Sequence, residues 1–406
     1  MGRVVSRGSC RVACVVSCRV GRVVSRGSCR VAWVVSCRVA WVVSCRVGRV
    51  AWVVSRGSCR VGRVAWVVSR GSCRGRVVLS HSGVVRPPGI GMLRPMRAIT
   101  VSTYGSPLVL SEVADPVPGD GQELVDVIYA SVNPLDIWVS QGNFAGVTPQ
   151  PHIPGVEGLV RRSNGEHALA MGVGLAGPGT YAQRLAAPSS GLIPVPADMD
   201  QQQAAGLGVA GVTAWMCLHA LAEVTSTDTV LVLGASGGVG SVAAQLAKIA
   251  GATVIGQTSS ASKVAAVEAL GARAIVAASG AELAGALTGT APTVVIEGIG
   301  GDFTGACVDV VAPGGRIVNF GTSAGTAVGF DMRTFYRKGT RLLGYGGLLL
   351  TPPQRDRAFA ALFANIADGS LRIPIDEVLP LAQANEAHQR ILNKQVEGKL
   401  LLDPTR

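Results

Sequence analysis

The sequence predicts an α/β fold whose main part is a doubly wound parallel sheet, and three observations carry this prediction. Val230-Leu-Val-Leu233 is a β-prone apolar run that leads into glycines at positions 234, 237, 238 and 240. A helical pattern, Ser241–Ala250, follows at once, and Thr253–Gln257 supplies the next strand. Beyond it, strand and helix patterns alternate as far as residue 345. Such alternation forces right-handed crossovers, which give a parallel sheet with helices on both faces.

The turn at residues 234–240 has the chemistry of a phosphate-binding helix N-terminus. Glycine lets the backbone bend sharply and approach a pyrophosphate, while free N–H groups and the helix dipole favour the anion. An ordinary tight turn is the alternative, but the strand before and the helix after it favour dinucleotide binding. The candidate cofactor contacts in this turn are Gly234, Ala235, Ser236, Gly237, Gly238, Val239 and Gly240.

Residues 96 to about 205 show a different pattern, that of a small domain built mostly from strands. Arg97–Val101 and Leu124–Ile128 alternate as half-buried strands do, and Asp115–Gly121 has turn chemistry. We expect the residues after Pro352 to return to this domain. The further elements expected are strands at Thr229–Leu233, Thr253–Gln257, Ala274–Val276, Thr293–Ile296, Gly315–Phe320, Arg341–Leu343 and Gly398–Leu402, and helices at Gly238–Ala250, Ala261–Leu270, Ala281–Leu287, Asp302–Val311, Gln354–Asp368 and Gln383–Asn393.

The first 95 residues have a composition unlike the rest of the chain. They hold 18 Arg and eight of the ten Cys, but no Lys, Asp or Glu. Subtracting this +18 from the net charge of +12 leaves −6 for residues 96–406. The acidic remainder gives no electrostatic reason to expect nucleic acid or an anionic membrane as a partner. Val31–Arg38 recurs as Val39–Arg46, and Gly48–Arg60 recurs as Gly62–Arg74.

We expect residues 1–95 to be a low-complexity extension, disordered or absent from the native protein, because the repeats have no helical periodicity and no carboxylates to pair with arginine. The favoured hypothesis is a translated tandem repeat upstream of a native start at Met92 or Met96. An Arg-rich, acid-poor targeting peptide is the second hypothesis. The third is a nucleic-acid-binding arm, in which arginines contact phosphates and the tryptophans stack on bases.

Cysteine usage and hydropathy point to a cytoplasmic protein. Residues 96–406 hold only Cys217 and Cys307, which is consistent with a reducing compartment and no disulfide framework. Ala204–Ala222 is long and apolar enough to cross a membrane. Its three glycines, Thr213, His219 and the lack of a basic flank favour a buried helix or helix pair instead.

A family resemblance rests on several short motifs that occur in one order. They are Met96-Arg-Ala-Ile, Ser131-Val-Asn-Pro-Leu-Asp136, Ile153-Pro-Gly-Val-Glu-Gly158, Gly179-Thr-Tyr-Ala182, Ala210-Gly-Val-Thr-Ala214, Gly234-Ala-Ser-Gly-Gly-Val-Gly240 and Gly314-Gly-Arg-Ile-Val-Asn-Phe-Gly321. With these motifs, residues 96–406 resemble the medium-chain dehydrogenase/reductase superfamily, and within it the zinc-free quinone oxidoreductases, including the ζ-crystallin-like enzymes.

The resemblance implies two domains with the nicotinamide in the cleft between them. A GroES-like catalytic domain is expected over residues 96–209 and 351–406, and a Rossmann domain over residues 210–350. The resemblance also implies a homodimer, formed through an edge strand such as Arg316–Phe320 or Arg341–Leu343.

The resemblance argues against a metal. Zinc-dependent relatives carry Cys, His and Cys where this chain has Asn133, Val156 and Val209. Valine side chains and an Asn amide cannot serve as the thiolate and imidazole donors of catalytic zinc. A quinone needs no such help, because it stabilises the anion that hydride transfer produces, and positioning of the nicotinamide face supplies most of the catalysis.

NADPH is favoured over NADH as the cofactor. The acidic residue that binds the ribose of NAD after the second strand is missing from Gln257–Lys263. Ser259 and Lys263 match positions that contact the 2′-phosphate of NADPH in the quinone oxidoreductases. The alternative is that these residues only cap and solvate the following helix.

The resemblance also assigns residues to the cleft. Asn133 and Asp136 match an Asn-x-x-Asp motif whose amide faces nicotinamide and substrate, and they are the candidate catalytic residues; a turn that opens a helix is the alternative. Thr213, Phe320 and Gly321 match positions near the nicotinamide.

The chain departs from the family pattern in three places. Trp138 and Phe144 stand where relatives often carry tyrosines, so a phenolic proton donor is lost there. Ala278 stands where a tyrosine commonly flanks the adenosine phosphate, and the stretch between Gly158 and Gly179 is short. The five histidines show no spacing typical of a ligand set or a triad.

Two main hypotheses of function follow. The first is a zinc-independent NADPH reductase that acts on a quinone or an α,β-unsaturated carbonyl. The second is a low-turnover NADPH-binding protein with a structural or regulatory role, as in a lens crystallin. Nucleic-acid binding through the arginine repeats is a third and weaker hypothesis.

Overall fold

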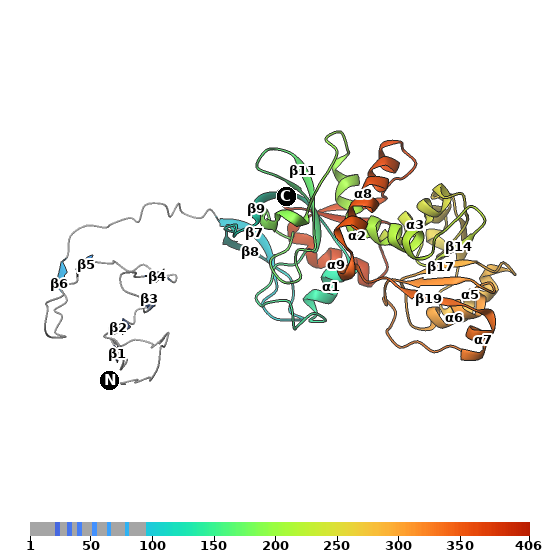
Figure 1. Cartoon of the computed structure of the whole chain (residues 1–406), viewed down its shortest axis with the longest axis horizontal. Coiled ribbons are helices and arrows are strands. Elements are labelled where there is room, and N and C mark those ends of the chain that lie inside the picture. Colours follow the sequence, from blue (N-terminus) through green and yellow to red (C-terminus); the bar gives the residue numbers. More distant parts are fainter. Residues whose placement is uncertain are drawn as a thin grey trace. The chain divides into compact units, whose positions relative to one another are not determined.

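The computed structural model describes residues 95–406 together with six short strands between residues 21 and 80 (Figure 1). The six strands pair antiparallel in twos, β1 (Gly21–Val24) with β2 (Val31–Val34), β3 (Val39–Val42) with β4 (Ala51–Val54), and β5 (Arg63–Ala65) with β6 (Val78–Ser80). The other residues of the extension lie outside the described part of the chain. The hypotheses about it, a translated repeat, a targeting peptide or a nucleic-acid-binding arm, therefore stay predictions.

The GroES-like catalytic domain expected over residues 96–209 and 351–406 corresponds to a seven-stranded sheet with strands from both parts of the chain. Its order is β13-β11-β10-β9-β21-β20, and β12 also pairs with β9; a separate hairpin joins β7 to β8. The C-terminal strand β21 lies between β9 and β20, so the tail returns to this domain as expected. The elements are β7 (Pro95–Thr100), β8 (Val109–Ala114), β9 (Gln122–Ser131), α1 (Pro134–Ser140), β10 (Glu157–Arg161), β11 (His167–Met171), β12 (Arg184–Pro188), η1 (Ser189–Gly191), β13 (Leu192–Pro194), β20 (Ile375–Pro380), η5 (Leu381–Gln383), α9 (Ala384–Leu392) and β21 (Lys399–Asp403).

The short stretch between Gly158 and Gly179 leaves the sheet continuous. β10 and β11 form an antiparallel hairpin in which Glu157 faces Met171 and Arg161 faces His167. The turn is closed by the Arg162 N–H, which donates to the Glu166 carbonyl at 2.9 Å. The departure from the family pattern is therefore a tight hairpin.

The Rossmann domain holds a six-stranded parallel sheet in the order β16-β15-β14-β17-β18-β19. Each strand and helix expected between residues 229 and 345 is present within one residue of its predicted bounds, and α7 is an additional helix. The elements are β14 (Thr229–Val232), α3 (Gly238–Ile249), β15 (Thr253–Thr258), η3 (Ala261–Lys263), α4 (Val264–Ala269), β16 (Arg273–Val276), α5 (Gly280–Leu287), β17 (Val294–Glu297), α6 (Asp302–Val310), β18 (Arg316–Asn319), α7 (Met332–Lys338), β19 (Arg341–Gly344) and η4 (Gly347–Leu349).

Alternate residues of β14 serve two separate cores. Val230 and Val232 pack in a cluster with side chains of α3, whereas Leu231 and Leu233 pack in a cluster with α5 and α6. Successive side chains of a strand point to opposite faces, so the apolar run that predicted a fully buried strand is explained by two covered faces.

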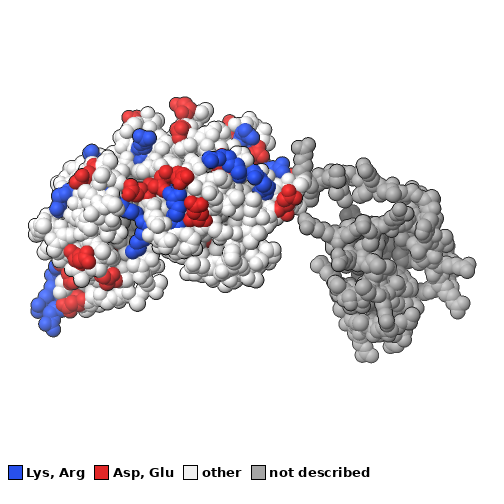
Figure 2. All heavy atoms as spheres, turned by 180° about the vertical axis from the view of Figure 1, so that it is seen from behind, with Lys and Arg blue, Asp and Glu red and all other residues white. Residues whose placement is uncertain are grey.

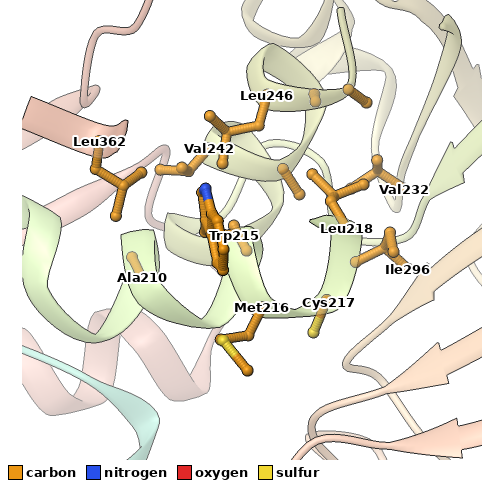
Figure 3. Packing of buried hydrophobic residues seen from close by; sticks show 14 of the residues in the cluster. Ala210, Trp215, Met216, Cys217, Leu218, Val232, Val242, Leu246, Ile296 and Leu362 are labelled. Carbon is orange, nitrogen blue, oxygen red and sulfur yellow. The ribbon is translucent and has the colours of Figure 1, made fainter. Parts of the chain in front are cut away.

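The apolar segment Ala204–Ala222 is a helix of the protein interior. It forms α2 (Gln201–Trp215), which continues as a π-helical turn, η2 (Met216–Leu221). Among the described residues there is one helix, Gln201–Leu221, that is long enough and apolar enough to cross a membrane. However, 78% of its most apolar stretch is buried inside the protein. Figure 3 shows why: Trp215, Met216, Cys217 and Leu218 pack among side chains of β14, α3, β17 and α8 (Pro352–Ala367).

Charged side chains are dispersed on the face of residues 95–406 that Figure 2 shows. Basic and acidic residues are interspersed there and separated by wide uncharged areas. This distribution is in keeping with the small net charge of residues 96–406.

One buried ion pair joins the amino ends of three neighbouring strands of the parallel sheet. Asp228 precedes β14, and its carboxylate accepts hydrogen bonds from both terminal nitrogens of Arg316, at 2.9 and 2.8 Å. The Thr293 hydroxyl, just before β17, donates to the same carboxylate at 2.7 Å. Burial alone would raise the pKa of Asp228, but Arg316 and Thr293 outweigh it and hold the pKa at about 2.

We predict that Asp228→Asn lowers the free energy of unfolding by about 2 kcal/mol at pH 7. The folded-state pKa lies below the unfolded value, so the contribution is complete above pH 4 and shrinks as pH falls toward 2. Urea unfolding at pH 7 and at pH 3 measures both effects. Asp126→Asn is the control, because the Asp126–Arg161 pair is half exposed, and it should change stability little. Equal losses for both variants would contradict the prediction.

Candidate functional site

The glycine-rich turn leaves the carboxyl end of β14 and opens α3. Gly234 has a φ of 61°, in the left-handed region that glycine adopts without strain. Gln257 of β15 fixes this turn: its Oε1 accepts from the Gly234 N–H at 2.8 Å, and its Nε2 donates to the Ala277 carbonyl at 2.6 Å. The Ala235 N–H also donates to the Gln257 carbonyl at 2.9 Å. A buried amide thus ties the turn to the neighbouring strand.

The N-terminus of α3 has no side-chain cap, and Gly398 pairs with Gly237 beside it. Gly237 is the N-cap residue, and it provides no side-chain hydrogen bond to the first turn. A Cβ at Gly240 would come within 2.2 Å of the Gly234 carbonyl oxygen, so helix and turn pack too closely for a side chain. The start of a 12-residue helix without a side-chain cap is the kind of place where a diphosphate can bind. The seven predicted turn residues lie together there, between β14 and the first turn of α3.

Phe320 and Gly321 follow β18 at the same carboxyl edge of the sheet. Buried Glu297, at the end of β17, orders the adjoining loops: its Oε1 accepts from the N–H groups of Ile299 and Gly300, both at 2.6 Å, and its Oε2 contacts the Asn319 amide. The ring of Phe320 lies against Gly298, where a Cβ would be 2.4 Å away. Open α/β sheets bind ligands at this edge, beside the switch in strand order between β14 and β17.

Ser259 and Lys263 lie just beyond the carboxyl end of β15, and the structure gives Lys263 protein partners. Its ammonium donates to the carbonyls of Lys394, at 2.6 Å, and Val396, at 3.1 Å. An ammonium has three donors, so one N–H of Lys263 is still available to a ligand. Ser259 is exposed. Ser259 and Lys263, the two predicted 2′-phosphate contacts, thus lie on the same rim, the segment just beyond the carboxyl end of β15. Lys263 also anchors the loop before β21.

Asn133 lies at the N-terminus of α1 with both ends of its side-chain amide occupied. Its Nδ2 donates to Glu157 Oε1 at 2.9 Å and to the Ser131 carbonyl at 3.2 Å. Its Oδ1 accepts from the Lys399 ammonium at 2.7 Å. The resemblance places this amide facing nicotinamide and substrate, whereas the structure shows it 4% exposed and engaged with buried charges.

Asp136 is a helix cap rather than an exposed acid. It is fully buried, and its carboxylate accepts from the N–H groups of Asn133 and Val156, both at 2.8 Å. Burial raises the pKa of Asp136 to about 7, and the two N–H groups oppose that rise. The Tyr181 hydroxyl donates to Asp136 at 3.2 Å and lies 3.1 Å from His388 Nε2. This geometry fits the helix-opening alternative, and we assign Asp136 a positioning role in place of the catalytic one expected.

Lys399 connects this cluster to the glycine turn. Its ammonium reaches Asn133 Oδ1, Glu157 Oε1 at 3.3 Å and the Val132 carbonyl at 3.2 Å, while the side chain is 3% exposed. Its stem lies against Gly238, where a Cβ would be 2.9 Å from Lys399 Cδ. The preceding Gly398 N–H donates to the Ser236 carbonyl at 2.8 Å. One strand end therefore contacts both the glycine turn and the cleft residues.

Two of the three positions where zinc-dependent relatives carry ligands, Val156 and Val209, belong to an apolar cluster that we call the apolar wall. Val156 packs with Val139 and Leu175, and the partly buried Val209 and Phe144 pack against them. These side chains offer no metal ligand. Within residues 95–406, no group of three His, Cys, Asp or Glu side chains lies close enough to hold a metal ion.

Sequence reasoning missed the partners that hold this site together. Glu157, considered as an anchor of its turn, is a fully buried acid that accepts from Asn133, Lys399 and the Val209 N–H. Lys399 carried one usable signal, a lysine in an otherwise apolar strand. His388 carried none, and burial lowers its pKa to about 4. Thr213, expected near the nicotinamide, is 7% exposed within α2.

Comparison with known proteins places the chain among nicotinamide-dependent oxidoreductases. A family model described as zinc-binding dehydrogenase matches residues 238–363. The quinone oxidoreductase of Sus scrofa is 28% identical over 323 residues, which cover 76% of this chain and 97% of that protein. The Homo sapiens quinone oxidoreductase is also 28% identical, with the same two shares of coverage.

Solved structures show the same arrangement of domains. The mycobacterial protein Rv1454c, whose structure was determined in complex with NADPH, superposes with a TM-score of 0.70. It is 26% identical, and the match covers 76% of this chain and all of that one.

We predict that Lys399→Met lowers the free energy of unfolding by about 3 to 5 kcal/mol, because it leaves the Glu157 carboxylate buried without a cation. The double variant Lys399→Met/Glu157→Gln should lose clearly less than the sum of the two single losses. Denaturant unfolding measures the cycle, and Lys248→Met, which changes an exposed lysine of α3, is the matched control. Additive losses would show that the ion pair is not coupled.

Proposed function

The chain is a quinone oxidoreductase-like member of the medium-chain dehydrogenase/reductase family, and from that premise we propose that it transfers hydride from NADPH to a quinone or an α,β-unsaturated carbonyl without zinc. It is an oxidoreductase that uses a nicotinamide cofactor and a small-molecule substrate. The observation that carries the proposal is the glycine turn and uncapped N-terminus of α3 at the carboxyl edge of the parallel sheet, next to Lys399, which contacts Asn133.

The dinucleotide would lie along the carboxyl edge of the parallel sheet. The turn at Gly234–Gly240 would hold its diphosphate, and Phe320 and Gly321 would flank the nicotinamide. When bound, the cofactor supplies the hydride. The protein's part is to orient that ring against the acceptor and to exclude water, which the apolar wall around Val156 and Leu175 supports.

Independence from zinc is supported by the chemistry of the residues present. The side-chain amide of Asn133 is hydrogen-bonded to Glu157 and Lys399, and the side chains of Val156 and Val209 have no atom that could coordinate zinc. A quinone or enone accepts hydride into a conjugated system that spreads the resulting charge, so it makes less demand on a Lewis acid than an alcohol does.

Preference for NADPH is supported by the rim beyond β15. Lys263 is held there with one N–H still available, Ser259 is exposed, and residues 257–263 include no carboxylate to repel a phosphate. We also propose a cytoplasmic location, because Cys217 and Cys307, both buried and free, show no disulfide in residues 95–406.

We further propose a homodimer through β19. Of the two strands suggested by the sequence, β18 is excluded as an edge because β17 and β19 pair with it on both sides. β19 pairs with β18 alone among the described residues, and Leu342 on it is 39% exposed. The segment after it exposes Leu348 and Leu349 by 71% and 83%. An open, apolar strand edge favours pairing with a second copy.

The function is tested by NADPH and NADH oxidation with a panel of quinones and enones. We expect turnover with NADPH, no loss after extensive treatment with chelator, and a KM for NADPH that Lys263→Glu raises at least tenfold more than the KM for NADH. Loss of turnover on chelation would refute zinc independence, and equal effects on both cofactors would refute the role of Lys263. Tight NADPH binding without turnover on any acceptor would support the crystallin-like alternative, which the buried state of Asn133 and Asp136 favours.

The dimer is tested by the double variant Leu342→Asp/Leu349→Asp. Charges at this edge should convert a dimer into a monomer in light scattering coupled to size exclusion, with circular dichroism unchanged. Val117→Asp is the matched control, since Val117 is 71% exposed in the turn before β9. A wild-type protein that runs as a monomer, or a double variant that stays dimeric, would refute the interface.

A further inference from the structure

Tyr345 lies at the carboxyl edge of the parallel sheet, directly after β19. Its backbone N–H donates to the Asn319 carbonyl at 2.8 Å, so it is level with the end of β18. The Asn319 side chain in turn donates to the Gly321 carbonyl at 2.9 Å. Tyr345 therefore stands beside Phe320 and Gly321, on the edge where an open α/β sheet receives its ligand.

The hydroxyl of Tyr345 is buried, and among residues 95–406 no group meets it with full hydrogen-bond geometry. The ring packs against the core cluster that contains α2, and the Thr213 side chain of that helix is a weak hydrogen-bond partner of the hydroxyl. Burial is the main cause that raises the pKa of Tyr345 to about 12; Cys217 adds to the rise, and the weak hydrogen bond with Thr213 opposes it. The phenol therefore keeps its proton at neutral pH. A buried polar group without a full hydrogen bond is rare and costly, and a polar ligand atom would supply that bond.

Tyr345 is unlike the other tyrosines of the chain in this respect. Tyr181 donates to Asp136, Tyr104 donates to the Thr148 carbonyl at 2.6 Å, and Tyr336 is 62% exposed on α7. Tyr129, in β9, belongs to the catalytic-domain sheet. Tyr345 alone among the five combines a place at the carboxyl edge with a buried hydroxyl that lacks a full hydrogen bond.

The segment after Tyr345 is apolar and close to the hydroxyl. A Cβ at Gly347 would lie 3.8 Å from Tyr345 Oη, and Leu348 and Leu349 follow in η4. These surroundings favour an apolar molecule that carries a carbonyl oxygen, because that oxygen would meet the Tyr345 hydroxyl.

We propose that Tyr345 donates a hydrogen bond, and then its proton, to the carbonyl oxygen of the acceptor. This inference rests on the proposed function and names its proton donor. Hydride arrival forms a C–H bond on the acceptor and moves an electron pair of the conjugated system onto that oxygen. The Tyr345 O–H bond breaks as the new O–H bond forms, and the phenolate regains a proton from water. The acceptor is reduced by two electrons and the cofactor is oxidised by two. Tyr345 thereby supplies the phenol that Trp138 and Phe144 cannot.

Tyr345→Phe separates this role from a structural one. Replacing a weakly bonded buried hydroxyl with hydrogen should leave the melting temperature unchanged or raised. The kcat/KM for an enone should fall at least tenfold, with a smaller fall for a quinone, which stabilises its own anion, and the Kd for NADPH should stay within twofold. Tyr336→Phe, at an exposed tyrosine, is the matched control and should change none of these values. An enone rate that Tyr345→Phe leaves intact would overturn the inference.

A readout that needs no turnover keeps the inference apart from the proposed function. 4-Nitrophenolate, added to the complex with NADP⁺, carries an oxyanion whose absorbance band shifts when it accepts a hydrogen bond. We expect the shift in the wild type and in Tyr336→Phe, and its loss in Tyr345→Phe. A wild type that shows no shift, or a Tyr345→Phe variant that keeps it, overturns the assignment of Tyr345. A shift that depends on Tyr345 in a protein without turnover would instead overturn the proposed function and leave the donor site standing.

Discussion

The buried ammonium of Lys399 is the constraint on which the rest of the site depends. An ammonium that is 3% exposed must be matched by acceptors, and the structure provides Glu157, Asn133 and a carbonyl of the strand end before α1. Removing water from a charged group costs several kcal/mol of free energy, so losing one of its partners would be strongly destabilising. Gly398 donates a hydrogen bond to Ser236 in the glycine turn, and the next residue, Lys399, bonds to Asn133. Two adjacent residues of the chain therefore hold the turn and Asn133 in place relative to each other.

This arrangement divides the polar residues of the cleft into two kinds. Asn133, Asp136, Glu157 and Tyr181 have their hydrogen-bonding atoms engaged with one another, with Lys399 or with backbone N–H groups. Groups used in this way shape a site but have little capacity left for a substrate. In the function that we propose, contacts to cofactor and substrate would therefore come from other groups, namely the amides at the start of α3 and the Tyr345 hydroxyl. A rigid polar network of this kind would help to hold a nicotinamide ring in a fixed orientation against an acceptor.

The sequence predicted most of the backbone because the signals are local. A buried strand of the parallel sheet is a short apolar run, and a glycine turn between a strand and a helix is recognisable without knowing what surrounds it. The polar network could not be predicted in the same way. Lys399 and Asn133 are 266 positions apart, and Tyr181 and His388 are 207 apart. No local sequence pattern can predict contacts between residues so far apart in the chain. The tie between Gln257 and the turn was missed for a subtler reason, because the same residues were considered only as possible contacts of the ribose.

The apolar wall bears on the chemistry that we propose for this chain. Where zinc-dependent relatives concentrate positive charge, this chain places Val156 and Val209 beside Leu175 and Phe144. In such a low-dielectric place an alkoxide would be poorly stabilised, and an alcohol would have no route to give up its hydride. An acceptor whose charge is delocalised over a conjugated ring or enone makes the opposite demand, since it loses little when water is removed and needs one well-placed donor at its oxygen. Valine at two of the zinc-ligand positions and the apolar cluster around them therefore both support the reduction of a conjugated carbonyl that we propose.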